Sequence, residues 1–174
     1  MQRIALLSDT HAFFDTRFYE LFACVDQIWH AGDIGSEEVL DMMVAFKPVR
    51  AVYGNVDDAN IRLRLPEMLR FDCEGVDVLM THIGGYPGRY DARIQRKIFA
   101  NPPRLFISGH SHILKIMNDS QLGLLHINPG AAGKFGFHTI QTAVRFVLDK
   151  GTIKDMEVIE LVNGELKVEN EKVE

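Results

Sequence analysis

Cysteine and long hydrophobic runs are scarce in this 174-residue sequence, and basic residues are outnumbered by acidic ones. Cys24 and Cys73 lack the close spacing of a redox pair or a zinc knuckle, so we expect both to be buried structural thiols. The apolar run near the N-terminus covers only four residues, too few for a signal peptide or a membrane span. We therefore expect a cytoplasmic protein that does not associate with membranes.

The charge balance argues against one class of partner. The formal net charge of −5 does not suit broad binding to nucleic acid, which needs many basic side chains facing the phosphates. An acidic surface also repels phosphorylated small molecules, but bound divalent cations would reverse that sign locally. Apolar residues make up 47% and charged residues 25%, as in ordinary globular proteins, and the length predicts one domain over residues 1–174.

The order of apolar and polar segments predicts an α/β fold with mixed sheets. Apolar runs typical of buried strands alternate with segments whose apolar residues recur every three or four positions, as in helices. Val44 and Phe99 are expected on buried helix faces, and hairpin turns are expected at 149–151 and 163–164. No structure is favoured for residues 57–70. The expected strands cover 4–8, 27–30, 49–53, 76–80, 105–108, 124–127, 144–148 and 152–161, the last two antiparallel. The expected helices with their caps cover 14–26, 36–47 and 91–100.

Polar clusters follow five of these strands. If a single sheet aligns the strand ends, all five clusters reach one edge. Their markers are separated by 22 to 28 residues, about one strand and its connection each. The clusters are Ser8-Asp9-Thr10-His11, Gly32-Asp33, Gly54-Asn55, Thr81-His82 and Gly109-His110-Ser111-His112.

The residue types in these clusters are those of a metal site. Asp9 and His11 are two positions apart, so in an extended segment both side chains point the same way and can grip one ion. His110 and His112 have the same spacing and suit either one ion or two adjacent ions. Asp33 is our preferred bridge, because a carboxylate has two oxygens. Carboxylate, amide and imidazole donors together suit manganese, iron, zinc, cobalt or nickel.

The ordered motifs resemble the calcineurin-like metallophosphoesterase superfamily, whose pattern is D-x-H, G-D, G-N-H-[DE], a lone H and G-H-x-H. The match runs from Asp9 to His112, and the short chain with its Asn128-Pro129-Gly130 segment is most similar to the small single-domain phosphodiesterase branch. The resemblance implies a four-layer α/β/β/α sandwich with the metal site at the C-terminal ends of the strands. It also implies two divalent ions, manganese favoured. One would be held by Asp9, His11, Asp33 and His112, and the other by Asp33, Asn55, His82 and His110.

The implied activity is hydrolysis of a small phosphoester by a hydroxide that the two metals bridge, with Asn55 also contacting substrate. Val56 occupies the position where many members have a histidine that stabilises the transition state or protonates the leaving oxygen. Two other interpretations stay open. The chain could be a non-catalytic, metal-stabilised scaffold that binds protein partners, or a phosphodiesterase specific for cyclic nucleotides.

Several further residues carry weaker predictions. His30 either orients the ligands or is a buried structural histidine, and His126 is expected in the core. His138, with Lys134, is a candidate for the mouth of the site. A solvated surface is the expected place of Arg89 and Arg93, with contact to a substrate phosphate as the alternative. Apolar strands near the C-terminus would permit a homo-oligomer.

Overall fold

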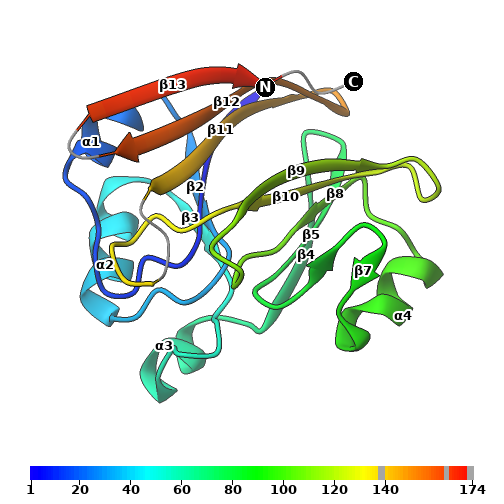
Figure 1. Cartoon of the computed structure of the whole chain (residues 1–174), viewed down its shortest axis with the longest axis horizontal. Helices are drawn as coiled ribbons and strands as arrows, with labels where there is room; N and C mark the ends of the chain where they lie inside the picture. Colours follow the sequence, from blue (N-terminus) through cyan, green and yellow to red (C-terminus); the bar gives the residue numbers. More distant parts are fainter. Residues whose placement is uncertain (137–139, 163–164, 172–174) are drawn as a thin grey trace.

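The structure is a computed structural model that describes residues 1–136, 140–162 and 165–171, and two main sheets pack face to face within it (Figure 1). The first contains, in spatial order, β13 (Glu165–Glu171), β12 (Thr152–Val162), β11 (Gln141–Asp149), β1 (Gln2–Leu7), β2 (Gln27–His30) and β3 (Val49–Ala51). The second contains β4 (Met68–Cys73), β5 (Val76–Thr81), β8 (Leu105–Ile107), β10 (Leu124–Pro129) and β9 (Leu114–Asp119). A small hairpin is formed by β6 (Gly85–Tyr86) and β7 (Arg89–Tyr90).

Alternation along the strands builds the layers. In β1, Ile4 and Leu6 face the second sheet, and the intervening Ala5 and Leu7 face the helices on the other side. This is the two-residue period of a strand buried on both faces. The core between the sheets takes Trp29 from β2, whose ring packs edge-on against Phe146 of β11.

Helices cover both outer faces of the paired sheets. On the first sheet lie α1 (Arg17–Leu21) and α2 (Glu37–Phe46), while α4 (Ala92–Ala100) buries Ile94 and Ile98 against the second. A fourth helix, α3 (Ala59–Arg64), follows β3. The order is therefore helix, sheet, sheet, helix, and the predicted α/β/β/α sandwich of two mixed sheets is confirmed.

Parallel pairing aligns the strand ends that matter for the site. β1, β2 and β3 are parallel neighbours in one sheet, and β5 and β8 are parallel neighbours in the other. Parallel strands end at the same edge, so the five polar clusters leave their strands on one side of the sandwich. They come from both of the facing sheets, three from one and two from the other.

Three local predictions are wrong. The helix expected over 14–26 is only α1, because Asp15 accepts hydrogen bonds from the backbone N–H and side chain of Arg17 and the preceding chain turns at Ala12, where φ is +62°. Val44 and Phe99 are 53% and 54% exposed rather than buried, since each lies at the margin of its helix's apolar face. Cys24 is exposed, whereas Cys73 is buried as expected.

The C-terminal part is antiparallel, as predicted. β11 and β12 pair through a turn in which Asp149 lies opposite Thr152. The second expected turn, at residues 163–164, lies outside the described residues, but β12 and β13 on either side pair. Leu166 and Val168 on the edge strand β13 are 49% and 41% exposed, and self-association there stays a prediction. Among the described residues, no helix has the length and hydrophobicity needed to cross a membrane.

Candidate metal centre

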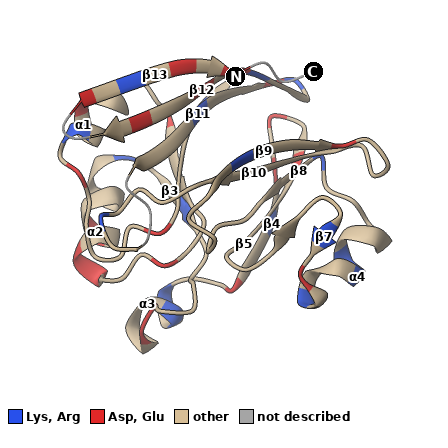
Figure 2. Cartoon of the chain, viewed as in Figure 1, with Lys and Arg blue, Asp and Glu red and all other residues tan. Residues whose placement is uncertain are grey.

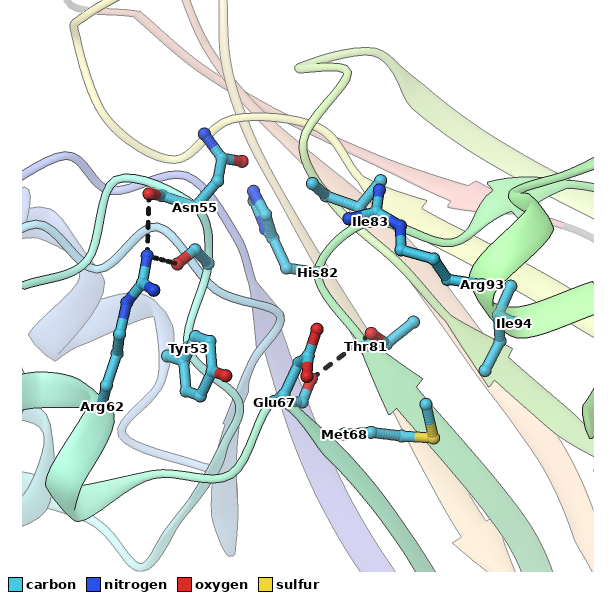
Figure 3. Close-up of a pocket in the computed structure, with 11 residues that line it drawn as sticks. Tyr53, Asn55, Arg62, Glu67, Met68, Thr81, His82, Ile83, Arg93 and Ile94 are labelled. Carbon is cyan, nitrogen blue, oxygen red and sulfur yellow. Dashed lines mark hydrogen bonds between the residues drawn. The ribbon is translucent and has the colours of Figure 1, made fainter.

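Six of the seven predicted ligands line cavities where the two sheets meet, and the seventh, Asp9, is buried behind them. All of the seven except Asn55 form two groups whose nitrogen and oxygen atoms lie within 4.8 Å of one another. One group is Asp9, His11 and His112, and the other is Asp33, His82 and His110. Asn55 is exposed and lines the same groove as Asp33 and His110, and it also lies beside His82 at the rim of a neighbouring pocket (Figure 3).

The atoms that could bind a metal, imidazole nitrogens and carboxylate oxygens with lone pairs, lie close to one another. Nε2 of His11 lies 3.1 Å from Nε2 of His112, which lies 3.2 Å from Oδ1 of Asp9. On the other side, Nε2 of His82 lies 3.1 Å from Oδ2 of Asp33 and 3.9 Å from Oδ1 of Asp9. The two groups are therefore contiguous, with Asp9 close to both.

Three buried side-chain atoms have no hydrogen bond among the described residues, and two of them belong to this cluster, Oδ1 of Asp9 and Nε2 of His82. The third is Nδ1 of His126 in β10. A buried polar atom without a partner costs about 1–3 kcal/mol, and a charged one more. An oxygen and an imidazole nitrogen are the donor types that transition metals bind, so these residues fit a divalent cation.

A backbone contact sets the orientation of His82. Its Nδ1 lies 2.8 Å from the carbonyl oxygen of Ala31, which can only accept, so the proton lies on Nδ1. Neutral His82 then presents the lone pair of Nε2 to the cleft. This is the arrangement by which metal-ligating histidines are usually fixed.

Five of the seven side chains stand on backbone in the left-handed region. The φ angles are +55° at Asp9, +47° at His11, +56° at Asp33, +69° at His110 and +58° at His112. Such angles are uncommon for residues other than glycine, and strained backbone concentrates at functional sites because the surrounding structure must hold it. The side chains are thus aimed by sharp turns immediately after the strands.

The electrostatics of the cluster favour bound positive charge. Burial raises the pKa of Asp9 and of Asp33, but the neighbouring imidazoles outweigh burial and leave both pKa values below the ordinary one. Burial lowers the pKa of His82, yet the carboxylates of Asp33 and Asp9 outweigh it and leave that pKa raised. In this cluster the carboxylates stay ionised and attract cations.

The family model described as the calcineurin-like phosphoesterase superfamily domain matches residues 2–151. The chain belongs to this superfamily. A relative from Methanocaldococcus jannaschii named probable metallophosphoesterase is 31% identical over 137 residues, with 74% of this chain and 67% of the relative covered. Another of that name, from Methanothermobacter thermautotrophicus, is 29% identical over 133 residues, with 74% and 76% covered.

Solved structures of other proteins share the fold across nearly the whole chain. The structure of vacuolar protein sorting 29 from Cryptosporidium parvum has a TM-score of 0.81 at 20% identity, covering 98% of this chain and 96% of that one. A structure described as a novel archaeal phosphodiesterase has a TM-score of 0.70 at 21% identity, covering 90% and 99%.

Residues to which sequence reasoning gave no role hold the loops of this superfamily site together. The buried carboxylate of Asp57 accepts hydrogen bonds from the backbone N–H of Gly35, at 2.7 Å, and of Gly54, at 2.8 Å. It thereby ties the loop after Asp33 to the loop that carries Asn55. Its place in the Gly54-Asn55-Val56-Asp57 motif was the available signal.

The loop that carries His110 and His112 is held in the same manner. Nδ2 of Asn128 donates to the carbonyl of Gly109 and to the hydroxyl of Ser111, and Oδ1 of Asn128 accepts from the backbone N–H of Gly130. Asn128 belongs to the Asn128-Pro129-Gly130 segment that sequence analysis singled out without assigning it a task.

Two glycines are required by close approach. A Cβ on Gly54 would collide with the carboxylate of Asp33, and one on Gly109 would collide with the hydroxyl of Ser8. Both glycines precede a candidate ligand directly, so the motif spacing reflects packing as well as chemistry.

The remaining histidines and basic residues divide clearly. His30 is fully buried, accepts from the N–H of Gly32 at Nδ1 and lies 3.0 Å from the hydroxyl of Thr10 at Nε2, so it connects loops beneath the cluster. His126 is buried in β10, as predicted. His138 lies outside the described residues. The ammonium of Lys134 sits 4.2 Å from the ring centroid of Phe13.

An open groove of about 330 Å³ runs over the candidate ligands. His11, Asp33, His110 and His112 line it on the polar side. Val56 and Phe135 line it as well, although they are 53% and 67% exposed. The groove therefore sets an apolar surface beside a cluster of metal-binding side chains.

Proposed function

We propose that this protein is a divalent-metal-dependent phosphodiesterase. One observation carries the proposal: Oδ1 of Asp9 and Nε2 of His82 are buried in the cleft without hydrogen bonds among the described residues. The superfamily pattern assigns one ion to Asp9, His11, Asp33 and His112, and the other to Asp33, Asn55, His82 and His110. Manganese is the favoured metal and the cytoplasm the favoured compartment.

When bound, two such ions would supply positive charge that neutralises the phosphoryl oxygens and would activate water for attack. The roles of the chain's own residues follow from their positions. Asp33 has Oδ1 accepting from the N–H of Val56 and Oδ2 close to His82, and its charge also acts on His11 and His112 of the other group, so it is suited to bridge. Asn55 projects beside His82 and has an amide N–H with which to orient a phosphoryl oxygen.

The groove favours a diester over a monoester. A diester carries an ester group on each side of the phosphorus, and one of these needs a surface that is not charged. Val56 and Phe135 offer such a surface next to the ligand cluster. The shared fold with the protein described as an archaeal phosphodiesterase supports the same class.

Val56 also bears on the choice of leaving group. Valine holds no proton, so at this position the departing oxygen must leave without help from a side chain. General acid assistance is worth ~10²- to 10⁴-fold in rate. Aryl esters, which leave as stable phenolates, should therefore be hydrolysed much faster than alkyl esters.

The second candidate function is a scaffold that retains its metals for stability. The close fold similarity to vacuolar protein sorting 29 motivates it. The full set of seven candidate ligands favours an enzyme instead, because stability alone would not require two contiguous groups. A specific cyclic-nucleotide phosphodiesterase would be a narrower form of the enzyme.

The decisive experiment combines metal analysis with turnover. Purified protein is incubated with Mn²⁺, its bound metal is counted, and hydrolysis of bis(p-nitrophenyl) phosphate is followed with and without chelator. We expect two ions per chain and turnover that chelator abolishes. Asp33→Asn should lose both the bound metal and the turnover. Asp155→Asn is the matched control, because Asp155 is exposed, far from the site and at φ +51°, which asparagine tolerates. Metal binding without turnover of diesters, monoesters or cyclic nucleotides would establish the scaffold instead.

A further inference from the structure

A separate pocket of about 300 Å³ lies beside the metal cluster, next to His110. The hairpin β6–β7 and the start of β9 both contribute to its wall. We propose that it is a substrate subsite for a nucleotide-like ester group, with a planar ring against its apolar wall and a second phosphate held by Arg89 and Lys115. The inference rests on the proposed phosphodiesterase function and names its class of substrate.

The size and position of the pocket suit an ester group of the substrate. Its volume lies at the lower end of the range for small-molecule sites. His110 lines both this pocket and the open groove over the ligands, so a diester whose phosphorus lies at the metals can extend one group into each. Ile83, Tyr86 and Ile113 provide apolar surface, and Ile113 is 61% exposed.

The basic side chains of the pocket come from two different elements. Arg89 belongs to β7 and Lys115 to β9, and Figure 2 shows both strands carrying basic residues on this side of the molecule. The ammonium of Lys115 lies 3.9 Å from the ring centroid of Tyr86, which holds the cation at the wall. No ion pair of Arg89 occurs among the described residues.

The carboxylate in this pocket is already neutralised. Asp91 caps α4 and accepts from Arg93 through both carboxylate oxygens, from Nε at 2.8 Å and from a terminal nitrogen at 3.1 Å. Arg89 and Lys115 therefore leave the wall with a surplus of positive charge. On a chain with a net charge of −5, this is a local reversal of sign that favours an anionic group.

One polar atom of the pocket lining has no hydrogen bond within the described part of the chain. His126 is 1% exposed and lines the pocket, and its Nδ1 has no hydrogen bond among the described residues. Such a nitrogen can form a hydrogen bond with a polar atom on the edge of a ligand ring that packs against the apolar wall.

A second pocket, beside His82 and Asn55, lacks basic side chains that are available to bind a phosphate among the described residues that line it. It measures about 190 Å³ and contains two arginines, Arg62 and Arg93, on opposite walls (Figure 3). Arg62 donates to the backbone carbonyls of Asp57 and Asn55, and Arg93 is paired with Asp91. Glu67 adds negative charge to the lining. The pocket beside His110 is thus better suited to a second phosphate.

Three probes with the same ring separate the contributions. Adenosine, adenosine 5′-monophosphate and adenosine 3′,5′-bisphosphate are titrated calorimetrically into the metal-loaded protein, and each is tested as a competitive inhibitor of diester hydrolysis. We expect the bisphosphate to bind about tenfold more tightly than the monophosphate, since charge-assisted hydrogen bonds to a phosphate are the strong ones. Arg89→Met and Lys115→Met should each reduce that ratio to about threefold or less.

Arg96→Met is the matched control, because Arg96 is an exposed arginine on α4 outside the pocket lining. It should keep the parent's ratio. An equal ratio in the parent and in both pocket variants, or no preference for the bisphosphate in the parent, would overturn the subsite. If the parent shows the preference and its loss in the variants but hydrolyses no phosphoester, the subsite stands and the proposed function fails.

Discussion

Nδ1 of His82 donates a hydrogen bond of 2.8 Å to the carbonyl of Ala31, a residue 51 positions earlier in the chain. Ala31 follows β2 in one sheet and His82 follows β5 in the other, so the bond crosses the cleft between the sheets. It fixes the ring and directs Nε2 toward Asp33. The ring of His82 is therefore oriented by a contact to main chain and not by a side chain of β2.

This contact predicts the tautomer of His82 in the metal-loaded protein. With Zn²⁺ bound, long-range ¹H–¹⁵N NMR should show a proton on Nδ1, and the Nε2 resonance should move when metal is added. The reason is that a carbonyl oxygen cannot donate, so only Nε2 has a lone pair for the ion. An unprotonated Nδ1, or an Nε2 resonance that does not shift when metal is added, would contradict the assignment of His82 as a ligand.

Asp57→Asn should weaken metal binding without altering any candidate ligand. The amide nitrogen cannot accept, so one of the bonds from Gly35 and Gly54 is lost and the two loops separate. We expect a loss of stability of about 1–3 kcal/mol. The metal affinity should fall about 10- to 100-fold, as is usual for residues that position ligands.

Asp58→Asn provides the control for Asp57→Asn, since it removes the same charge one residue later. Asp58 caps α3 by accepting from the N–H of Ile61, and asparagine caps equally well. Urea unfolding and competition with a metal-binding dye measure the two effects. If Asp57→Asn and Asp58→Asn bind metal with the same affinity, any loss of affinity at position 57 comes from removing a negative charge. Asp57 would then not position the loops.

Val56→His should change the choice of leaving group. The side chain at this position is 53% exposed and lines the groove over the ligands, so an imidazole there can reach a departing oxygen. When methoxide leaves from a methyl aryl phosphodiester, its oxygen needs a proton from the imidazole. When p-nitrophenolate leaves, no proton is needed, because the phenolate is stable. We expect the kcat for alkyl leaving groups to rise about 10²-fold and that for p-nitrophenyl esters to change little. Equal changes for both leaving groups would show that the histidine acts on binding or folding instead.

Much of the site was predictable because its ligands follow strands whose sequences are distinctive. The segments before Asp9, Asp33 and His82 are short apolar runs bounded by polar residues, and all three form buried strands. Since parallel strands share an edge, the order of motifs already implied that the ligands meet. Membership of the superfamily is confirmed, and the assignment of individual residues to individual ions stays a prediction, as does the single domain.

What the sequence could not predict depends on contacts between distant segments. α1 covers only five residues, although Phe18 and Phe22 are both buried in the core at helical spacing. β9, with a half-exposed pattern, and α3, with two arginines in six residues, lack a clear apolar period. The tie made by Asp57 also needs the positions of two loops, which no local pattern contains.

Stability should fall in acid because of His126, a buried residue that is no candidate ligand. Burial lowers its pKa from 6.5 to about 4, so the fold keeps the ring neutral while the unfolded chain takes up a proton below about 6.5. Its contribution is fully present above the unfolded pKa and is lost as the pH falls from about 6.5 toward 4, by ~2 kcal/mol at pH 5. Urea unfolding of the parent and of His126→Phe at pH 7 and pH 5, both with chelator to remove any effect of bound metal, measures this contribution of His126 to stability. His30, whose pKa burial likewise lowers to about 4, contributes in the same direction in both proteins. The parent should therefore lose about 2 kcal/mol more than the variant between the two pH values, and equal losses would mean that the ring of His126 accepts its proton inside the fold.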